Sequence, residues 1–357
     1  MDVIYTDFSK AFDTVNHRIL LHKLAEFGFS PKLVQLFHSY LQDRTQFVEY
    51  KGVSSGEYRS TSGVPQGSVL RPFLFLIFVN DIADNVLFSV VSLFADDLKI
   101  YRFINSENDC NKLQEDLRIL TEWSNKNMMP FNLGKCEKIS FTRKRIPIHF
   151  DYKIADTVLM NRQYVRDLGV MLDSKLSYNI HIDHISLKCK RILGFIKRNS
   201  INYTDFGTIK IIYSAFARSI LEYSSLVWDP TTQVSINKIE KIQKSFLKYL
   251  YFRAFSYYPV DTTYNELLAG FEISSLQSRR SLSKLLFLWD MLNDRIKNAK
   301  QLSYVDFRIP SFNGRNTDLF AVKASKSPID RTLALYNRIV REEPLVDIFY
   351  MLSLIHI

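Results

Sequence analysis

An apolar run ends in two adjacent carboxylates in the stretch Ser89-Val-Val-Ser-Leu-Phe-Ala-Asp-Asp-Leu-Lys-Ile-Tyr101. After the carboxylates, apolar and polar residues alternate through Phe103, which is the period of a strand with one buried face. The stretch therefore predicts a hairpin with Asp96 and Asp97 at its turn. Because adjacent strand residues point to opposite faces, at most one carboxylate faces a site directly, and the other reaches it through the turn.

A second acidic stretch lies near the N-terminus and reads Asp2-Val-Ile-Tyr-Thr-Asp-Phe-Ser-Lys-Ala-Phe-Asp13. Its β-prone residues 3–6 deliver Asp7 at the end of a strand. Taken alone, Asp96 and Asp97 are equally consistent with a polar turn, because Asp favours turns. Two strands that both end in carboxylates can instead surround one point with oxygen donors, which Mg²⁺ prefers. Two such ions clamp the attacking and leaving oxygens of a phosphoryl transfer.

The composition is that of a globular chain with a basic excess. The 357 residues are 46% hydrophobic and 24% charged, and the formal net charge is +10. A chain of this length buries a substantial core, and we expect two domains or one elongated unit of several parts. The charge favours a polyanionic partner, nucleic acid before an anionic membrane. The segment from Lys188 to Arg253 carries +8 of the excess, with twelve Lys and Arg residues against four acids.

Other classes of protein are excluded by what the sequence lacks. The three cysteines are far apart and form no Cys-x-x-Cys pair, so we expect a reducing compartment, no disulfides and no zinc knuckle. The longest apolar run, Phe73 to Val79, is too short to span a bilayer, and no signal peptide opens the chain. His181 and His184 have no further ligands nearby in the sequence, so we expect both on the surface.

The order of the predicted elements indicates an α+β sheet with helices on one face. A mainly helical half with no convincing strand begins at Tyr178, and the basic segment Arg143-Lys-Arg-Ile-Pro147 marks the predicted seam. The predicted elements are a strand at 3–6, helices at 17–27 and 31–41, a hairpin at 46–59, a glycine-rich bend at 62–68, a helix at 69–82, the acidic hairpin, a helix at 111–129, a turn and strand at 133–141 and a hairpin at 164–172.

Several blocks of the sequence carry a family resemblance. The first three are Tyr5-Thr-Asp-Phe-Ser-Lys-Ala-Phe-Asp13, Gly63-Val-Pro-Gln-Gly-Ser68 and Phe94-Ala-Asp-Asp97. They resemble motifs A, B and C of the reverse transcriptases of non-LTR (LINE-type) retrotransposons, of the jockey-like branch. Trp123-Ser124 with Lys135-Cys136 resembles motif D, and Leu168-Gly-Val-Met-Leu-Asp173 resembles the primer-grip hairpin of motif E. Arg218-Ser-Ile-Leu-Glu-Tyr223 with Val227-Trp-Asp-Pro230 resembles the helical region after the thumb.

The resemblance implies the right-hand polymerase palm, an antiparallel sheet with helices on one face, followed by a mainly α-helical thumb and C-terminal region. We expect the following parts: a palm with motifs A to D at 1–145, a primer-grip-like hairpin region at 146–175, a basic helical thumb or connection at 176–260, a helical C-terminal region at 261–351 and a tail at 352–357. The tail fits no element and resembles translated sequencing-adapter readthrough, so we leave it out of the fold.

The resemblance also assigns roles to the acidic residues. Asp7 and Asp96 are expected to be the principal metal-binding carboxylates, and Asp97 a third and weaker one. The backbone carbonyl of Phe8 is expected to complete the shell of one metal. The implied cofactors are two Mg²⁺ ions, with Mn²⁺ as an alternative.

The nucleotide-binding residues follow from the same resemblance. Phe12 lies five residues after Asp7, where the family places a steric gate whose ring excludes a 2′-hydroxyl. By pattern alone Phe12 is a core aromatic. Gln66 and Gly67 are expected near the incoming nucleotide and template base, although an ordinary turn explains their pattern as well. Lys135 is expected near the leaving pyrophosphate, as charge stabiliser or proton donor, although lysines are usually solvated.

Two further segments are expected to hold nucleic acid. The primer grip is assigned by resemblance to Leu168, Gly169 and Val170. A row of lysines at helical spacing can track phosphates, but the solvated face of an amphipathic helix fits the pattern equally well. The local charge excess favours nucleic acid. The row comprises Lys238, Lys241, Lys244 and Lys248, opposite the apolar Ile239, Ile242, Phe246 and Leu250.

The sequence departs from the family pattern in two places besides the tail. Met1 stands six residues before Asp7, so we expect the fingers to lie upstream and to be largely missing, with no endonuclease domain, as in a truncated reading frame. Arg71 stands where the family normally has glycine, and we expect it to distort the following helix or to mark a decayed copy.

The function implied by the resemblance is that of an RNA-directed DNA polymerase fragment. Its partners are an RNA template, a DNA primer and deoxynucleotides, with no membrane, and family analogy places it inside the cell, in the nucleus or cytoplasm. One alternative is a viral RNA-dependent RNA polymerase, which the aromatic Phe12 and the Ala-Asp-Asp sequence disfavour. The other is an inactive nucleic-acid-binding remnant, which the absence of fingers favours.

Overall fold

The chain divides into two compact units at the hairpin of residues 164–173. The computed structural model describes residues 1–309, 318–325, 327–343 and 346–349. One unit comprises Met1–Val165 with Asp173–Leu176, and the other comprises Arg166–Leu172 with Ser177–Ile357. The first unit thus extends past the basic segment at 143–147, and the tail predicted at 352–357 lies outside the described residues.

The first unit is built on a five-stranded sheet whose central strand comes from the acidic N-terminal stretch. In spatial order its strands are β11 (Met160–Arg162), β8 (Glu137–Ser140), β1 (Asp2–Thr6), β7 (Asp97–Arg102) and β6 (Val90–Phe94). β1 pairs antiparallel with β7 and β8, and Ile4 lies opposite Ile100, with both side chains fully buried. The predicted hairpin of β6 and β7 is confirmed, and Phe94 pairs with Asp97 across a two-residue turn.

One edge of this sheet differs from the prediction. β11 and β8 run parallel, whereas the other neighbouring strands are antiparallel. Between β8 and β11 the chain passes through the small hairpin of β9 (Lys153–Ile154) and β10 (Thr157–Val158), and it returns in the direction of β8. The prediction of a wholly antiparallel sheet is wrong here, because side chains alternate in the same way along parallel and antiparallel strands.

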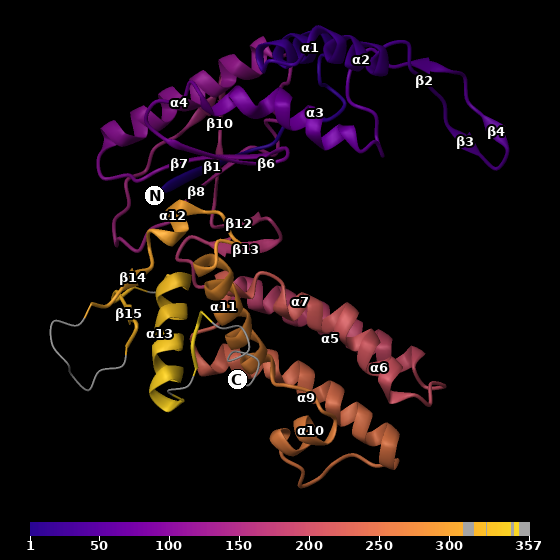
Figure 1. Cartoon of the computed structure of the whole chain (residues 1–357), viewed down its shortest axis with the longest axis vertical. Helices are drawn as coiled ribbons and strands as arrows, with labels where there is room; N and C mark the ends of the chain where they lie inside the picture. The colour runs from indigo at the N-terminus through magenta and orange to yellow at the C-terminus, as the bar shows by residue number, and fades with distance from the viewer. Residues whose placement is uncertain (310–317, 326, 344–345, 350–357) are drawn as a thin grey trace. The chain divides into compact units, whose positions relative to one another are not determined.

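The helices of the first unit lie over one face of this sheet, as predicted (Figure 1). Their apolar faces form one core with the sheet, which includes the fully buried Leu20, Phe75 and Leu117. These residues recur at helical spacing along amphipathic segments, which is why the segments fold as helices against the sheet. The helices are α1 (His17–Glu26), α2 (Pro31–Leu41), α3 (Leu70–Val79), the 3₁₀ turn η1 (Asn80–Ala83) and α4 (Glu107–Lys126).

α4 begins four residues before the predicted start at 111. Ser106 precedes the helix, and its backbone N–H donates to Asp109 Oδ2 at 3.1 Å. Asp109 also accepts from Arg102 Nη2 at 2.9 Å. The backbone N–H of Asn105 and the Arg102 guanidinium lower the pKa of Asp109 to about 2, so the cap stays ionised. The polar first turn of α4 is thus helical because polar side chains cap it, and not because it packs against the core.

A long excursion from the first unit separates α2 from the glycine-rich bend. It contains β2 (Thr45–Gln46) paired with β5 (Tyr58–Arg59), and β3 (Glu49–Tyr50) paired with β4 (Val53–Ser54). This confirms the hairpin predicted at 46–59. All eight of these strand residues are exposed, so the hairpin contributes nothing to the core.

The second unit is mainly helical, as predicted, and β12 (Tyr164–Asp167) and β13 (Val170–Asp173) form the predicted hairpin that leads into it. The short strands β14 (Asp306–Phe307) and β15 (Phe320–Ala321) pair with each other and were not predicted, since two-residue strands leave no periodic signal. The described helices are α5 (Asn179–Asn199), α6 (Phe206–Tyr213), the π-helical η2 (Ser214–Arg218), α7 (Ser219–Glu222), α8 (Ser225–Trp228), α9 (Gln233–Phe255), α10 (Tyr264–Gly270), α11 (Leu276–Leu292), α12 (Ala299–Leu302) and α13 (Pro328–Glu342).

Packing in the second unit joins helices that are distant in sequence. α5 packs along α9, and their contact buries Phe246 and Leu250, two of the predicted apolar residues of α9. α11 packs against α13 in a separate apolar cluster. Among the described residues, the helices are all too short or too polar to cross a lipid bilayer.

The buried carboxylate of Asp116 gives a test of the first unit. It accepts hydrogen bonds from the N–H groups of Leu87 at 2.9 Å and Phe88 at 3.0 Å, which ties α4 to the entry of β6. Asp116→Ala removes the buried carboxylate that accepts from both donors, and hydrogen bonds to a charged group are the stronger ones, so we expect a local loss of about 2–4 kcal/mol. Hydrogen exchange of α4 and β6 measures it. Glu115→Ala is the matched control, because Glu115 makes only an exposed ion pair, and an equal loss in both variants would contradict the assignment.

Candidate active site

The acidic residues of the two hallmark stretches meet at one end of the central strand pair. The last residues that β1 and β7 pair are Thr6 and Leu98, so Asp7 and Asp97 come next on adjacent strands. Asp96 precedes Asp97 as the second residue of the β6–β7 turn, whose first residue, Ala95, has a φ of +51°. Adjacent strands lie about 5 Å apart, so the backbone brings the three carboxylates to the same sheet end.

The backbone around Phe8 directs its carbonyl towards that end. The backbone carbonyl oxygen of Asp7 accepts from Asn132 N at 2.7 Å, and Ser9 N donates to the carbonyl oxygen of Pro130 at 2.9 Å, so both neighbours of Phe8 bond to the segment before β8. Bonding direction alternates along a strand, so the Phe8 carbonyl points to the opposite side, where β7 begins. The ring of Phe8 stacks on Phe131 at 4.9 Å and holds this register.

Lys135 lies beside the first carboxylate. Its ammonium nitrogen is 3.1 Å from Asp7 Oδ2, with the lysine side chain 67% exposed and the aspartate side chain 25% exposed. Asp7 Oδ2 is itself shielded from water and accepts no aligned hydrogen bond from any described residue. The oxygen therefore has unused acceptor capacity next to an exposed cation.

The donor types at this end suit a divalent metal. Carboxylate and carbonyl oxygens are the ligands that Mg²⁺ prefers, and Asp7 Oδ2 can accept from a further group besides the Lys135 ammonium. Within the described ranges, no three His, Cys, Asp or Glu side chains are gathered closely enough to hold a metal ion by themselves. Because Mg²⁺ keeps several waters and substrate phosphates in its shell, a complete protein cage is not required.

The glycine-rich loop is bonded backbone-to-backbone onto the stretch that carries Asp7. Gly63 N donates to Val15 O at 2.8 Å and Val64 N donates to Phe12 O at 2.9 Å. Gly63 has a φ of +84°, and a Cβ there would lie 2.8 Å from the Cα and carbonyl oxygen of Asp13. Only glycine permits this approach, which explains its place in the loop.

The predicted residues of this loop reach the same stretch. Gln66 is exposed, and its Nε2 donates to Asp13 Oδ1 at 3.4 Å. Gly67 has a φ of +78° and open space around it. A polar cavity of about 540 Å³ adjoins the loop, and Lys10, His17 and Gln66 are among the residues that line it.

Phe12 is half-buried and stacks on Phe75 of α3, with ring centroids 4.2 Å apart. The guanidinium carbon of Arg71 lies 4.4 Å from the centre of the Phe12 ring, a cation–π contact. The expected distortion by Arg71 is not observed, because α3 runs unbroken through it from Leu70 to Val79. The large side chain is accommodated by lying over the aromatic ring instead of pressing on the backbone.

The primer-grip candidates form a turn that is fastened to the rest of the second unit. Leu168 and Gly169 have φ values of +44° and +90°, and Leu168 O accepts from Tyr223 Oη at 2.9 Å. Val170 is buried, and Met171 N donates to His181 Nδ1 at 3.2 Å. The structure thus brings together two blocks that are separate in sequence.

His181 corrects a prediction. It was expected on the surface with His184, but only His184 is exposed, whereas His181 is 2% exposed and lies 5.2 Å from the Trp228 ring. Burial lowers the pKa of His181 to about 4, so the ring is neutral and can accept from Met171. The sequence did contain a signal for this burial, because His181 falls on the apolar side of an amphipathic helix.

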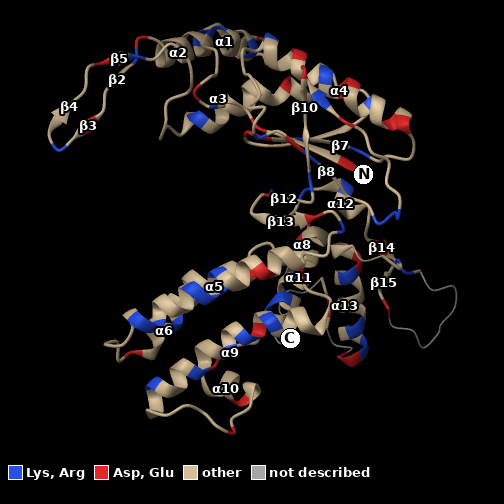
Figure 2. Ribbon diagram, turned by 180° about the vertical axis from the view of Figure 1, so that it is seen from behind, with Lys and Arg blue, Asp and Glu red and all other residues tan. Residues whose placement is uncertain are grey.

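The lysine row of α9 lies outside the core, as its spacing predicts, while Ile239 and Ile242 are buried. Lys238 forms an ion pair with Asp183 of α5, so that lysine is already engaged. Lys241 is exposed, and Lys244 and Lys248 are half-buried. Basic residues follow both α5 and α9 (Figure 2).

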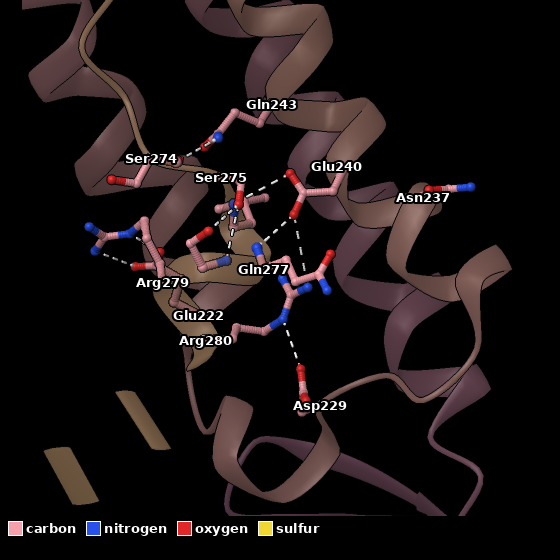
Figure 3. Close-up of polar contacts among 12 residues, drawn as sticks. Glu222, Asp229, Asn237, Glu240, Gln243, Ser274, Ser275, Gln277, Arg279 and Arg280 are labelled. Atoms are coloured by element: carbon pink, nitrogen blue, oxygen red, sulfur yellow. Dashed lines mark hydrogen bonds and ion pairs between the residues drawn. The ribbon is translucent and has the colours of Figure 1, made fainter. Parts of the chain in front are cut away.

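The acidic residues of the two C-terminal motif blocks hold a pair of arginines that sequence reasoning did not single out. Glu222 accepts from Arg279 Nη2 at 3.0 Å, and Asp229 Oδ1 accepts from Arg280 Nε at 2.9 Å (Figure 3). The adjacent arginines at the start of α11 were visible in the sequence, but their acidic partners lie about fifty residues away, at separations of 57 and 51.

Comparison with known proteins shows which family the sequence matches. The family model described as reverse transcriptase (RNA-dependent DNA polymerase) matches residues 3–196. The chain is 28% identical over 257 residues to the RNA-directed DNA polymerase from mobile element jockey of Drosophila melanogaster, covering 68% of this chain and 28% of that protein. It is 27% identical over 250 residues to the probable RNA-directed DNA polymerase from transposon X-element of the same species, with 67% and 27% covered.

The chain therefore belongs to the reverse transcriptase family, and the resemblance to polymerases of non-LTR elements is confirmed. It spans about 28% of the length of the jockey protein. Among solved structures, apo telomerase from Candida tropicalis aligns over 76% of this chain and 45% of that one, at 14% identity and a TM-score of 0.40.

The backbone contact at Gly63 yields a prediction. Gly63→Ala places a methyl group against Asp13, so we expect the loop to detach and the Gly63 and Val64 amides to exchange at least about tenfold faster, a loss of about 1–2 kcal/mol. Gly67→Ala is the matched control, with a similar φ and no neighbour within 4 Å. Equal exchange in both variants would show that the strained φ, not the close contact, sets the cost.

The buried His181 predicts a pH dependence. Its pKa is about 4 when folded, below its ordinary 6.5, so the unfolded state binds a proton first as the pH falls. The contribution of His181 to stability is therefore complete above pH 6.5 and is lost progressively towards pH 4. We expect the Met171 amide to lose protection over that range. His181→Asn, which retains an acceptor and cannot titrate, should remove this dependence; an unchanged pH profile would rule the role out.

Proposed function

We propose that the chain is the polymerase part of a non-LTR retrotransposon reverse transcriptase. It would join a primer 3′-hydroxyl to the α-phosphate of a deoxynucleotide on an RNA template, with release of pyrophosphate. The observation that carries the proposal is the meeting of Asp7, Asp96 and Asp97 at one end of β1 and β7, in a chain of this family. The rest of the site is consistent with that chemistry.

The acidic end of the sheet would hold the metal ions. Asp7, Asp96, Asp97 and the Phe8 carbonyl are the proposed ligands of two Mg²⁺ ions, with Mn²⁺ as an alternative. When bound, such ions stabilise the charge that develops on the attacking and leaving oxygens. Asp7 is best prepared for this role, because its Oδ2 is shielded from water and lacks an aligned donor.

Residues around the acidic end would position the nucleotide. Phe12 is held by the Phe75 ring and covered by Arg71, so it can act as a rigid wall that excludes a 2′-hydroxyl. Gln66 and Gly67 lie on a loop locked to the Phe12–Asp13 backbone, next to a polar cavity. Lys135 is mostly exposed and can leave Asp7 to stabilise or protonate the pyrophosphate.

The remaining parts would hold the nucleic acid. The sheet unit would be the palm, with 1–145 carrying motifs A to D, and 146–175 would contain the primer grip at Leu168, Gly169 and Val170. Segments 176–260 and 261–351 would form the thumb and C-terminal region. Lys241, Lys244 and Lys248 would contact phosphates, with Lys238 shared with Asp183. Action inside the cell, in the nucleus or cytoplasm, rests on family analogy.

Primer extension tests the proposal. We expect the chain to extend a DNA primer on an RNA template with deoxynucleotides and Mg²⁺, and Asp96→Asn to lower the rate by about 10³-fold or more, because the reaction loses a metal-binding carboxylate worth several kcal/mol. Asp84→Asn is the matched control, since Asp84 is exposed and away from the sheet end. Salt-sensitive retention of an RNA–DNA duplex without extension would contradict the proposal and support a binding remnant.

A further inference from the structure

A strongly basic pocket lies in the second unit between α8, α9, α11 and α13. Its volume is about 390 Å³, within the range of ligand pockets. Four cationic side chains line it, and Asp229 is the only acid among its lining residues. The four are Arg280, Lys284, Arg331 and Arg338. Nothing in the proposed polymerase chemistry uses this pocket.

Arg280 is the centre of the pocket. It is 2% exposed, and its Nε donates to Asp229 Oδ1 at 2.9 Å (Figure 3). Both of its terminal nitrogens, Nη1 and Nη2, are shielded from water and have no hydrogen-bond partner among the described residues. A buried guanidinium normally satisfies its donors, so the two unpartnered donors of this fork mark a place suited to an acceptor group.

The nearest acid outside the pocket forms no hydrogen bond with these two donors. Glu240 Oε1 lies 4.0 Å from Arg280 Nη2, beyond hydrogen-bond distance. Its oxygens are already taken, because Oε1 accepts from Gln277 N at 2.7 Å and Oε2 accepts from Tyr264 Oη at 2.6 Å. Glu240 thus caps the start of α11 and leaves the Arg280 fork open.

The other cations are fixed around the same space. Lys284 pairs with Asp229. Arg331 Nη1 donates to the Asp229 carbonyl at 2.6 Å, and its Nε is shielded and unpartnered within the described part of the chain. Arg338 is exposed at the rim. Even with Glu240 included, four cations face two carboxylates, so the pocket repels cations and attracts an anion.

We propose that this pocket binds a phosphate group of a polynucleotide strand. The planar fork of Arg280 offers two parallel donors, which match the oxygens of a phosphate, and Arg331 and Arg338 can contact further oxygens. Arg338 and Ala334 line the pocket and are exposed, so the pocket opens to solvent at this rim, where the strand would continue. The choice of a polynucleotide over free phosphate rests on the proposed function.

The test adds a negative charge to the rim without touching the buried network. Ala334 lines the pocket and is exposed on α13, so Ala334→Glu fits sterically, and Ala334→Gln is its uncharged match. Asn265→Asp makes the same charge change on the exposed surface of α10, outside the pocket lining. Two probes are used. Binding of inorganic phosphate is measured by calorimetry at constant ionic strength, and binding of labelled single-stranded RNA is measured by fluorescence anisotropy without metal or deoxynucleotides.

We expect Ala334→Glu to lower the affinity for both probes about tenfold, because the added carboxylate opposes the charge-assisted hydrogen bonds to the phosphate. The affinities of Ala334→Gln and Asn265→Asp should stay within about twofold of that of the unchanged chain. Arg338→Gln should lower the slope of log Kd against log salt for RNA by about one. This second variant carries the test if Ala334→Glu fails to fold.

Two results would overturn the proposal. Equal affinities of Ala334→Glu and Ala334→Gln for both probes would show that no phosphate enters the pocket. Weakened binding of inorganic phosphate with unchanged RNA affinity would show that the ligand is a small phosphate compound and not a strand. Neither result depends on polymerase activity, so failure of this proposal is separable from failure of the polymerase proposal.

Discussion

The pairing of β1 on both of its edges is the constraint on which the first unit depends. A strand with neighbours on both sides satisfies its backbone donors and acceptors without water, so its residues Val3 and Ile4 can be buried. The β1–β7 ladder stops after Thr6, and Asp7 therefore emerges where β7 begins. The position of the acidic site follows from backbone hydrogen bonds, which are less tolerant of displacement than contacts between flexible side chains.

The same principle extends the site outward. The glycine-rich loop is held to the Phe12–Asp13 backbone by main-chain hydrogen bonds, and the absence of a side chain at Gly63 permits their close approach. In the second unit, ion pairs instead of main-chain hydrogen bonds connect the motif blocks to their neighbours. Glu222 and Asp229 engage the adjacent Arg279 and Arg280, so one partly exposed and one largely buried ion pair connect the motif blocks to α11. Unequal pairing there leaves donors unused, which is the basis for the phosphate pocket.

Sequence patterns were most successful where a strong period coincides with a buried face. The strand β7, which buries Leu98 and Ile100, and the apolar face of α9 illustrate this, since both appear where alternation or helical spacing places them. Sequence patterns failed where polar residues or contacts between distant segments determine the local structure. The capped first turn of α4 has no apolar signal, the parallel edge of β11 depends on a crossover, and His181 is buried by Trp228, a neighbour remote in sequence.

The sequence by itself determined the family, the order of the motifs and which carboxylates are candidates for the site, because acidic residues at strand ends and glycines at fixed spacing are local signals. Only the tertiary structure decided which groups meet. It placed Lys135 beside Asp7, laid Arg71 over Phe12 and surrounded Arg280 with cations from α11 and α13. The physical reason is that a partner's identity depends on how distant segments pack, and that packing is set by the shared core and not by the spacing of residues along the chain.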